Sequence, residues 1–196
     1  MKLLAIAAAL ALLASPVLAQ NSVTAWSGEG YNVVGAAPGD DPGCVMFATY
    51  EIDGRSDVEF NLVWNGEKAF MALTSLDWSA ERDKVYEGFF FYFPQSDAIY
   101  NGGVTTGYVQ DYVHKGFLTG FEPDFLDRLA SEDRMFVMRL SETDEEGTVV
   151  ADLGLKGSGA AVAALRRCAA HVERREAARI EREKRNDYIA RDPFKS

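Results

Sequence analysis

The sequence is poor in the residues on which most enzymes depend. Its 196 residues include two cysteines, two histidines and six prolines. No GxSxG, HExxH or GxxxxGK(S/T) motif is present, and no GxGxxG follows a strand-like segment. The cysteines and histidines also lack the short ligand spacings of a zinc site, such as CxxC or HxxxH. We therefore expect neither a metal nor a cofactor.

Positive charge is scarce over most of the chain. The formal net charge is −10, and residues 20–172 carry 11 Lys and Arg against 24 Asp and Glu. Nucleic acids and anionic membrane surfaces require a basic footprint, so this composition argues against both as partners. Residues 173–196 differ, because they carry 8 basic residues against 6 acidic ones.

No long hydrophobic run follows the first 19 residues. Residues 1–19 resemble a secretory signal peptide: Lys2 supplies positive charge, an apolar run follows, and Val17–Leu18–Ala19 suits the cleavage site. We predict cleavage before Gln20, a periplasmic or secreted protein, and no stable membrane insertion after cleavage. A membrane anchor is the alternative, but an apolar run of about a dozen residues is too short to span a bilayer.

The two cysteines are interpreted in the light of export. Cys44 and Cys168 permit only one intramolecular pairing, and disulfides persist in oxidising compartments. We predict that they form a structural disulfide, and two buried free thiols are the alternative. Closing so long a loop would remove roughly 4–5 kcal/mol of unfolded-state entropy.

Short β-rich runs separated by turn residues dominate residues 23–155. This pattern predicts an antiparallel β-sandwich or a barrel-like body. Asn65–Gly66 separates Val58–Trp64 from Ala69–Leu76 and predicts a hairpin, because both turn residues tolerate the positive φ of a type I′ turn. Gly88–Phe93 is apolar on both faces, which predicts a central strand covered on both sides.

Two helices are expected in the second half of the chain. Pro123–Ala130 has a proline in its first turn and places its apolar side chains on one face. Ser158 is a suitable N-cap for a longer C-terminal helix. The apolar stripe of that helix comprises Ala161, Leu165, Cys168 and Val172. The predicted disulfide would therefore clamp the helix to the sheet near Cys44.

The expected fold is mainly β with helices, in the α+β class. After the signal peptide of residues 1–19, we assign residues 20–172 to one β-rich globular domain that includes the start of the C-terminal helix. Residues 173–196 form a charged helical extension, because the apolar stripe thins out after Val172.

The segment Asp152–Cys168 (DLGLKGSGAAVAALRRC) carries a family resemblance. It resembles the end of a group of small, mostly uncharacterised secreted Gram-negative proteins, in which a strand, a Gly-Ser step and small residues lead into a helix with the second of two cysteines. Trp26, Cys44 and Trp78 are counterparts of other features of the group. A more remote resemblance is to invasion-associated locus B-like periplasmic proteins. The resemblance implies export and a disulfide, and it implies no catalytic residues.

His114 is the candidate for acid–base chemistry, because it is the only histidine of the predicted β body. It lies beside a lysine in a glycine-flanked loop, where a histidine can act as a general base. Together with Asp111 it could serve a hydrolase that acts on glycan or peptide of the cell envelope. The alternative is an exposed or hydrogen-bonded loop histidine. His171, on the C-terminal helix, should be solvated.

Aromatic residues and glycines are interleaved over residues 99–121. Aromatic side chains on glycine-rich loops offer stacking surface beside accessible backbone, which suits a peptide, a glycan or a partner protein. We predict binding residues in this stretch, namely Tyr100, Tyr108, Tyr112 and Phe117. The alternative is that these rings fill a small β core, with glycines at bulges.

The sequence thus favours a non-enzymatic periplasmic or secreted binding or accessory module, whose partner would be another envelope protein or a glycan. The absence of catalytic motifs supports this interpretation. The envelope-directed hydrolase is the alternative, and a structural protein that assembles through its C-terminal helix is a third hypothesis.

Overall fold

The computed structural model of the protein describes residues 22–36, 43–52, 56–111, 113–141 and 144–190. Residues 1–21 lie outside these ranges, so the signal peptide and its cleavage before Gln20 stay predictions. Tyr112, one of the predicted binding residues, also lies outside the described residues.

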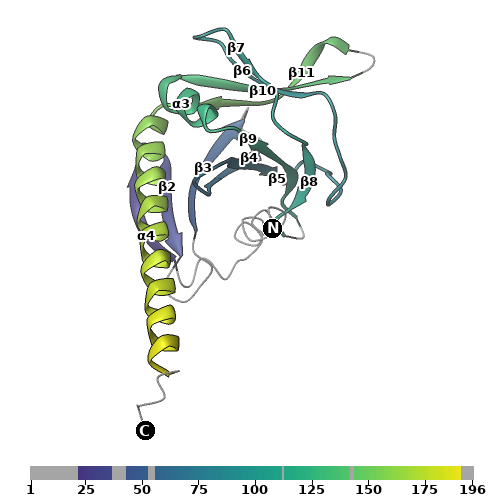
Figure 1. Ribbon diagram of the computed structural model, residues 1–196. Coiled ribbons are helices and arrows are strands. Elements are labelled where there is room, and N and C mark those ends of the chain that lie inside the picture. The colour runs from purple at the N-terminus through teal and green to yellow at the C-terminus, as the bar shows by residue number, and fades with distance from the viewer. Residues whose placement is uncertain (1–21, 37–42, 53–55, 112, 142–143, 191–196) are drawn as a thin grey trace.

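Two antiparallel sheets form the body of the molecule (Figure 1). The strands of the larger sheet are β1 (Ser22–Gly28), β2 (Tyr31–Ala36), β3 (Cys44–Ile52), β4 (Ser56–Trp64), β5 (Ala69–Ser75), β8 (Thr106–Val109) and β9 (Lys115–Phe121). The strands of the smaller sheet are β6 (Phe89–Phe93), β7 (Ala98–Tyr100), β10 (Arg134–Ser141) and β11 (Asp144–Gly154). Their orders are β1-β2-β3-β4-β5-β9-β8 and β11-β10-β6-β7, and neither sheet closes into a barrel.

Two helices complete the described part of the fold. Helix α3 (Asp124–Ser131) connects the two sheets between β9 and β10, and α4 (Ser158–Ala190) follows β11. Helix α4 packs on α3 and on the first three strands, and it then continues beyond the body toward the C-terminus (Figure 1). Within the described residues, neither helix has the length and apolar character needed to span a membrane.

One apolar core joins both sheets and both helices. Alternation along the strands supplies it: in β4, for example, Phe60 and Leu62 are fully buried while Glu59 faces the other side. Helix α3 contributes one buried face, and its Phe125 ring stacks on Phe121 of β9 with 3.8 Å between ring centroids. The helix predicted around Pro123–Ala130 is therefore confirmed.

Strand β6 is central in its sheet, as predicted, but only one of its faces is covered by another layer. Phe91 and Phe93 are fully buried in the core, whereas Phe90 and Tyr92 point the opposite way and are partly exposed. Tyr92 stacks on Phe136 of the neighbouring strand β10, with 6.4 Å between ring centroids. Aromatic neighbours within the same sheet therefore shelter the outer face that was expected to need a covering layer.

The hairpin of β4 and β5 is confirmed, but its turn is not of type I′. Trp64 pairs with Ala69, which leaves a loop of four residues. Only Gly66 has a positive φ, of 91°, whereas Asn65 does not. The Asn65 Oδ1 accepts hydrogen bonds from the backbone N–H groups of Glu67 and Lys68, at 3.0 and 2.7 Å. The asparagine thus shapes the loop through its side chain rather than through a left-handed backbone.

The predicted disulfide is present. Cys44, at the start of β3, and Cys168, in α4, are 124 positions apart with Cα atoms 6.0 Å from each other. Ser158 has another role than the predicted N-cap, because its buried hydroxyl donates to the carbonyl oxygen of Leu129 in α3 at 2.5 Å. Helix α4 is therefore fixed at one end by α3 and three turns later by a covalent bond to the sheet.

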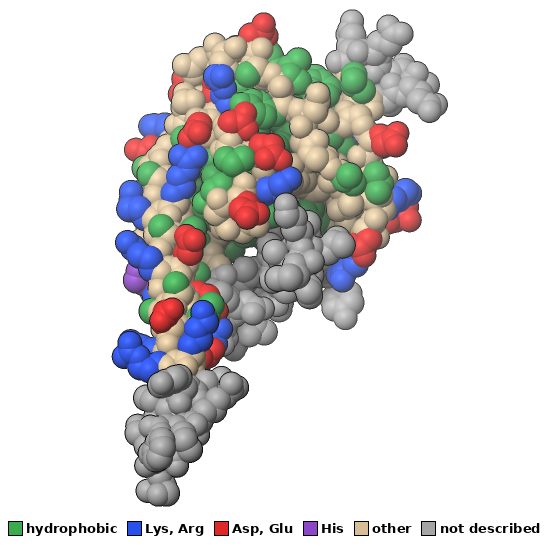
Figure 2. Space-filling view, in the orientation of Figure 1, with side chains coloured by type: hydrophobic (Ala, Val, Ile, Leu, Met, Phe, Trp, Pro, Cys, Tyr) green, Lys and Arg blue, Asp and Glu red, His purple; other side chains and the backbone are tan. Residues whose placement is uncertain are grey.

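The burial of α4 changes near Val172, although the helix itself is continuous. Between residues 173 and 186, Glu176 is the one described side chain that is not exposed. Arg179 pairs with Glu176 and Glu183 along the helix at 2.6 and 2.5 Å, and such pairs each contribute about 0.2–0.5 kcal/mol. Figure 2 shows Lys and Arg side chains along the outer edge of this helix.

Candidate functional site

An open pocket of about 300 Å³ lies at the junction of the two sheets. The segment after β5 forms one wall, β9 forms the floor, and β6, β10 and β11 form the opposite wall. The lining residues are Asp77, Trp78, Ser79, Ala80, Tyr86, Phe89, Gly116, Phe117, Arg139 and Val150.

Three aromatic rings pack together in this pocket, one pair of them stacked and the other tilted. Phe117 is almost fully buried at the floor, and Trp78 lies on it with 5.7 Å between ring centroids and an interplanar angle of 18°. Phe89 approaches the same ring from the smaller sheet, with a centroid distance of 4.5 Å. Because one face of the half-buried indole rests on Phe117, the orientation of Trp78 is fixed and part of its surface remains accessible.

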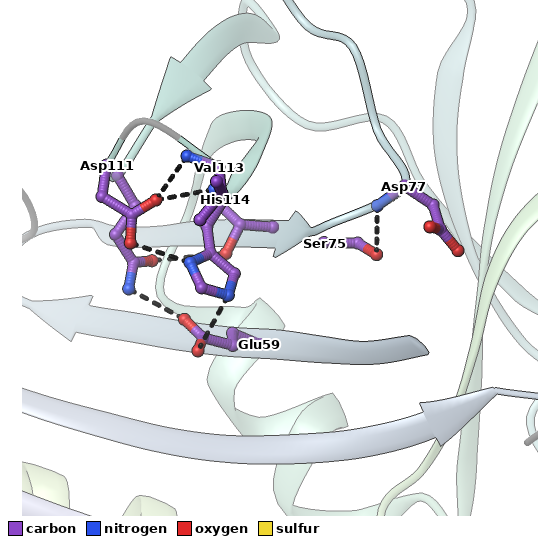
Figure 3. Close-up of polar contacts among 8 residues, drawn as sticks. Glu59, Ser75, Asp77, Asp111, Val113 and His114 are labelled. Carbon is purple, nitrogen blue, oxygen red and sulfur yellow. Dashed lines mark hydrogen bonds and ion pairs between the residues drawn. The ribbon is translucent and has the colours of Figure 1, made fainter. Parts of the chain in front are cut away.

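The local sequence after β5 explains how Trp78 comes to lie over β9. The backbone N–H of Asp77 donates to Ser75 Oγ at 3.3 Å, a contact visible in Figure 3, and the N–H of Trp78 donates to the Ser75 carbonyl at 3.5 Å. These bonds turn the chain at the end of the strand. The turn brings the indole back toward Phe117, whose strand pairs with β5.

Gly116 allows the pocket floor to form. An ideal Cβ built on this residue would lie 1.8 Å from the carbonyl oxygen of Leu73 on β5. Any other residue would have to displace backbone, which is costly in a central strand pair. The glycine therefore permits the close approach of the two strands directly beside Phe117.

Arg139 provides the positive charge of the pocket. Its guanidinium carbon lies 5.4 Å from the ring centroid of Tyr86 and 5.6 Å from that of Phe89, so two aromatic faces hold it in place. Its Nε donates to the Glu87 carbonyl at 3.4 Å. Asp77 is the other charged residue of the lining.

The two residues proposed for acid–base chemistry are brought together on the other face of the larger sheet (Figure 3). His114 Nδ1 lies 2.8 Å from Asp111 Oδ2, and Asp111 Oδ1 accepts the backbone N–H groups of Val113 and His114 at 2.8 and 2.7 Å. These hydrogen bonds, the backbone bond from His114 first among them, lower the pKa of Asp111 to about 2. The hydrogen bond to Asp111 in turn raises the pKa of His114 above its usual value.

A second carboxylate completes this cluster. His114 Nε2 lies 3.8 Å from Glu59 Oε1, and the other oxygen of Glu59 accepts a hydrogen bond from Gln110 Nε2 at 2.8 Å. In the described part of the chain, both polar contacts of the imidazole are made by carboxylates, and neither is made by a hydroxyl or thiol nucleophile. The arrangement suits a charged clasp between the loop before β9 and strand β4 better than a nucleophilic triad.

The three described residues of the predicted binding set, Tyr100, Tyr108 and Phe117, do not form one surface. Tyr100 donates to Asp124 Oδ2 at 3.1 Å and packs on the ring of Phe125. Tyr108 is buried in a small apolar cluster on the opposite face of the larger sheet, and this burial raises its pKa to about 12. Of the three described residues in this set, only Phe117 lines the pocket, as its floor. His171 is exposed on α4.

Sequence reasoning missed most of the pocket. Trp78, Tyr86, Phe89 and Arg139 lie in different segments. The register of the smaller sheet pairs Phe89 with Arg139, and the packing of the two sheets brings Trp78 to the same pocket. A tryptophan inside the polar segment 77–84 was the available signal, since large aromatic residues in polar loops often mark binding surfaces. In the sequence, Trp78 was noted only through the family resemblance.

The fold and the pocket define a disulfide-bonded, mostly antiparallel β protein with an open aromatic site between its sheets. No family model matches the chain, and neither does any curated protein or solved structure. The described residues contain no group of three or more His, Cys, Asp or Glu side chains placed to hold a metal ion.

Proposed function

We propose that the protein is a non-enzymatic binding module of the periplasm or the extracellular space, with the aromatic pocket as its ligand site. The observation that carries the proposal is the indole of Trp78, held on Phe117 at the wall of an open pocket. Its volume of about 300 Å³ is at the lower end of the range for ligand sites, roughly 300–1,000 Å³. The pocket therefore suits one ring or one side chain of a larger ligand.

The chemistry of the lining favours binding over catalysis. Asp77 and Arg139 are its only charged residues, and an arginine keeps its proton at all ordinary pH values. The other ionisable group of the described lining is the weakly acidic phenol of Tyr86, and neither histidine nor cysteine is among these residues. Export is supported by the disulfide, because such bonds persist outside the cytoplasm.

A binding experiment with two matched variants tests this proposal. The mature chain, beginning at Gln20, is presented with an array of envelope glycans and peptides, and each retained ligand is titrated by calorimetry. Trp78→Ala should weaken binding at least about tenfold, since a stacked aromatic anchor contributes 1–3 kcal/mol or more. Tyr92→Ala removes a ring of similar exposure outside the pocket and should bind as wild type does.

Two results would contradict the proposal. One is a wild-type protein that retains none of the array. The other is a ligand whose affinity is the same in the Trp78 and Tyr92 variants, because the ligand would then bind elsewhere.

An envelope hydrolase is the second candidate, and the 2.8 Å contact between His114 and Asp111 favours it. Hydrolysis of an envelope glycan or peptide by the wild type should then be lost in both Asp111→Asn and His114→Ala. Hydrolysis that survives in either variant would exclude this pair as its catalytic residues.

A further inference from the structure

The pocket combines an apolar interior with a single positive charge at its edge. We infer that it binds the C-terminal residue of a peptide, with the apolar side chain among the aromatic rings and the carboxylate on Arg139. This inference rests on the proposed binding function and adds to it the ligand class and the residue that selects it.

Arg139 is placed to receive an anion. On strand β10, Met135 and Val137 face the core, and Arg139 is the next residue on that face because alternate side chains of a strand point the same way. Arg139 pairs across the sheet with Phe89. Its guanidinium therefore lies at the end of a core-facing row, where the core opens into the pocket. The rings of Tyr86 and Phe89 restrict its movement, which lowers the conformational entropy lost when a ligand binds.

The hydrogen-bonding groups of Arg139 remain available. Nε is used by the Glu87 carbonyl, and no acidic side chain among the described residues lies within ion-pair distance of the guanidinium. Arg134, on the same strand, contrasts with it, because it binds Asp152 through Nε and Nη2. The two terminal nitrogens of Arg139 therefore offer the paired donors that a carboxylate accepts.

The surrounding charges favour a carboxylate over a doubly charged anion such as a phosphate monoester. One guanidinium balances one negative charge, and the nearby Lys84 is already paired with Glu81. Asp77 lies in the same lining and repels additional negative charge. The net charge of −10 for the whole chain also disfavours a doubly charged anion.

The lining favours a peptide terminus over a sugar acid. Apart from Asp77 and Arg139, the polar side-chain groups of the described lining residues are the hydroxyls of Ser79 and Tyr86 and the indole N–H of Trp78. A sugar ring would need several hydrogen-bonding partners for its hydroxyl groups, because an unpaired buried polar group is costly. A C-terminal residue with an apolar side chain carries a carboxylate next to an apolar group. This pairing complements the pocket, in which the guanidinium of Arg139 contacts the rings of Tyr86 and Phe89.

Two peptides that differ only at the C-terminus test the inference. An acetylated tripeptide that ends in phenylalanine is titrated into the full mature chain by calorimetry, once with a free carboxylate and once as the amide. We expect the free acid to bind at least about tenfold more tightly, since a charge-assisted bidentate pair is lost in the amide. Arg139→Gln should remove this preference, so that the variant binds the free acid no more tightly than the amide.

Arg134→Gln is the matched control, because it removes an arginine of the same strand whose guanidinium is already paired. It should keep the preference for the free acid. Arg139→Lys retains the charge without the fork of two donors and should give an intermediate preference.

The possible results separate this inference from the proposed function. Equal affinities for acid and amide in wild type, both lost in Trp78→Ala, would overturn the role of Arg139 and leave the pocket as a binding site. Binding of a carboxylated glycan in a Trp78-dependent manner, without binding of either peptide, would overturn the ligand class. Absence of binding by peptides and glycans alike would overturn both.

Discussion

At the scale of single residues, His114 shows how two carboxylates can make a loop sensitive to pH. The hydrogen bond to Asp111 raises the pKa of His114 above the ordinary 6.5. Its contribution to stability is therefore complete below about pH 6.5 and is lost as the pH rises through the folded-state pKa. Asp111 acts in the opposite sense: with its pKa lowered from 3.8 to about 2, its contribution is lost as the pH falls between these values. The clasp of His114, Asp111 and Glu59 is therefore most stabilising between about pH 3.8 and pH 6.5.

His114→Gln should therefore flatten the pH dependence of stability. As the pH rises above 6.5, we expect the free energy of unfolding of wild type to fall toward that of the variant by up to about 1 kcal/mol, the upper range for a partly exposed pair. Urea unfolding at a series of pH values measures this. His171→Gln removes an exposed histidine of α4 and should follow the wild-type curve. Parallel curves for wild type and His114→Gln would show that the clasp contributes nothing.

Replacement of Gly116 should disturb the floor of the pocket directly and lower the stability of the protein. A methyl group 1.8 Å from the Leu73 carbonyl oxygen cannot be accommodated without moving backbone. We expect Gly116→Ala to lower the free energy of unfolding by about 1–3 kcal/mol, as overpacking does. Gly154→Ala is the control, because an ideal Cβ there meets no atom within 4 Å. Equal thermal stabilities for the two variants would contradict the close approach.

At the scale of elements, the sequence predicts strands better than it predicts how they meet. The alternation of Val58–Trp64 and the one-sided apolar face of α3 follow from local periodicity, and both are confirmed. The predicted type I′ turn at Asn65 is wrong. The side chain of Asn65 accepts hydrogen bonds from the loop backbone, and its backbone does not adopt the positive φ that a type I′ turn requires. The pocket could not be predicted, since Trp78 and Arg139 become neighbours only through the packing of the two sheets.

The disulfide makes a prediction for one element in particular. Cys168→Ser should lower the free energy of unfolding by roughly 2–5 kcal/mol, the usual cost of losing a native bridge. Hydrogen exchange should increase in α4 before it increases in the strands, because the bridge is the covalent link between the helix and β3. Cys44→Ser breaks the same bond and serves as the comparison. An unchanged melting temperature in Cys168→Ser, or two reactive thiols in wild type, would contradict a stabilising clamp.

At the scale of the whole molecule, the body and the end of α4 differ in charge and in burial. The described side chains beyond Val172, residues 173–186, are exposed apart from the half-buried Glu176. The loss of the apolar stripe in the sequence predicts this change within a helix that runs past the body, and α4 does continue across the boundary to Ala190. Stability and ligand binding should therefore belong to the part of the chain before this point.

A chain that ends at Val172 tests this division. We expect its free energy of unfolding to remain within about 0.5 kcal/mol of that of the full chain, the usual range for removing exposed groups. Its affinity for any ligand of the pocket should also be unchanged. A larger loss of stability, measured by urea unfolding of both chains, would show that the extension contributes to the fold.

The bond between Cys44 and Cys168 also determines what a protease can do to this molecule. Because the bridge spans 124 positions, almost every loop of the body lies inside one covalent ring. A single cut anywhere within that ring opens it but releases no fragment. The two pieces would separate on a denaturing gel only after the bridge is reduced, so the body would survive a first nick as one covalent molecule.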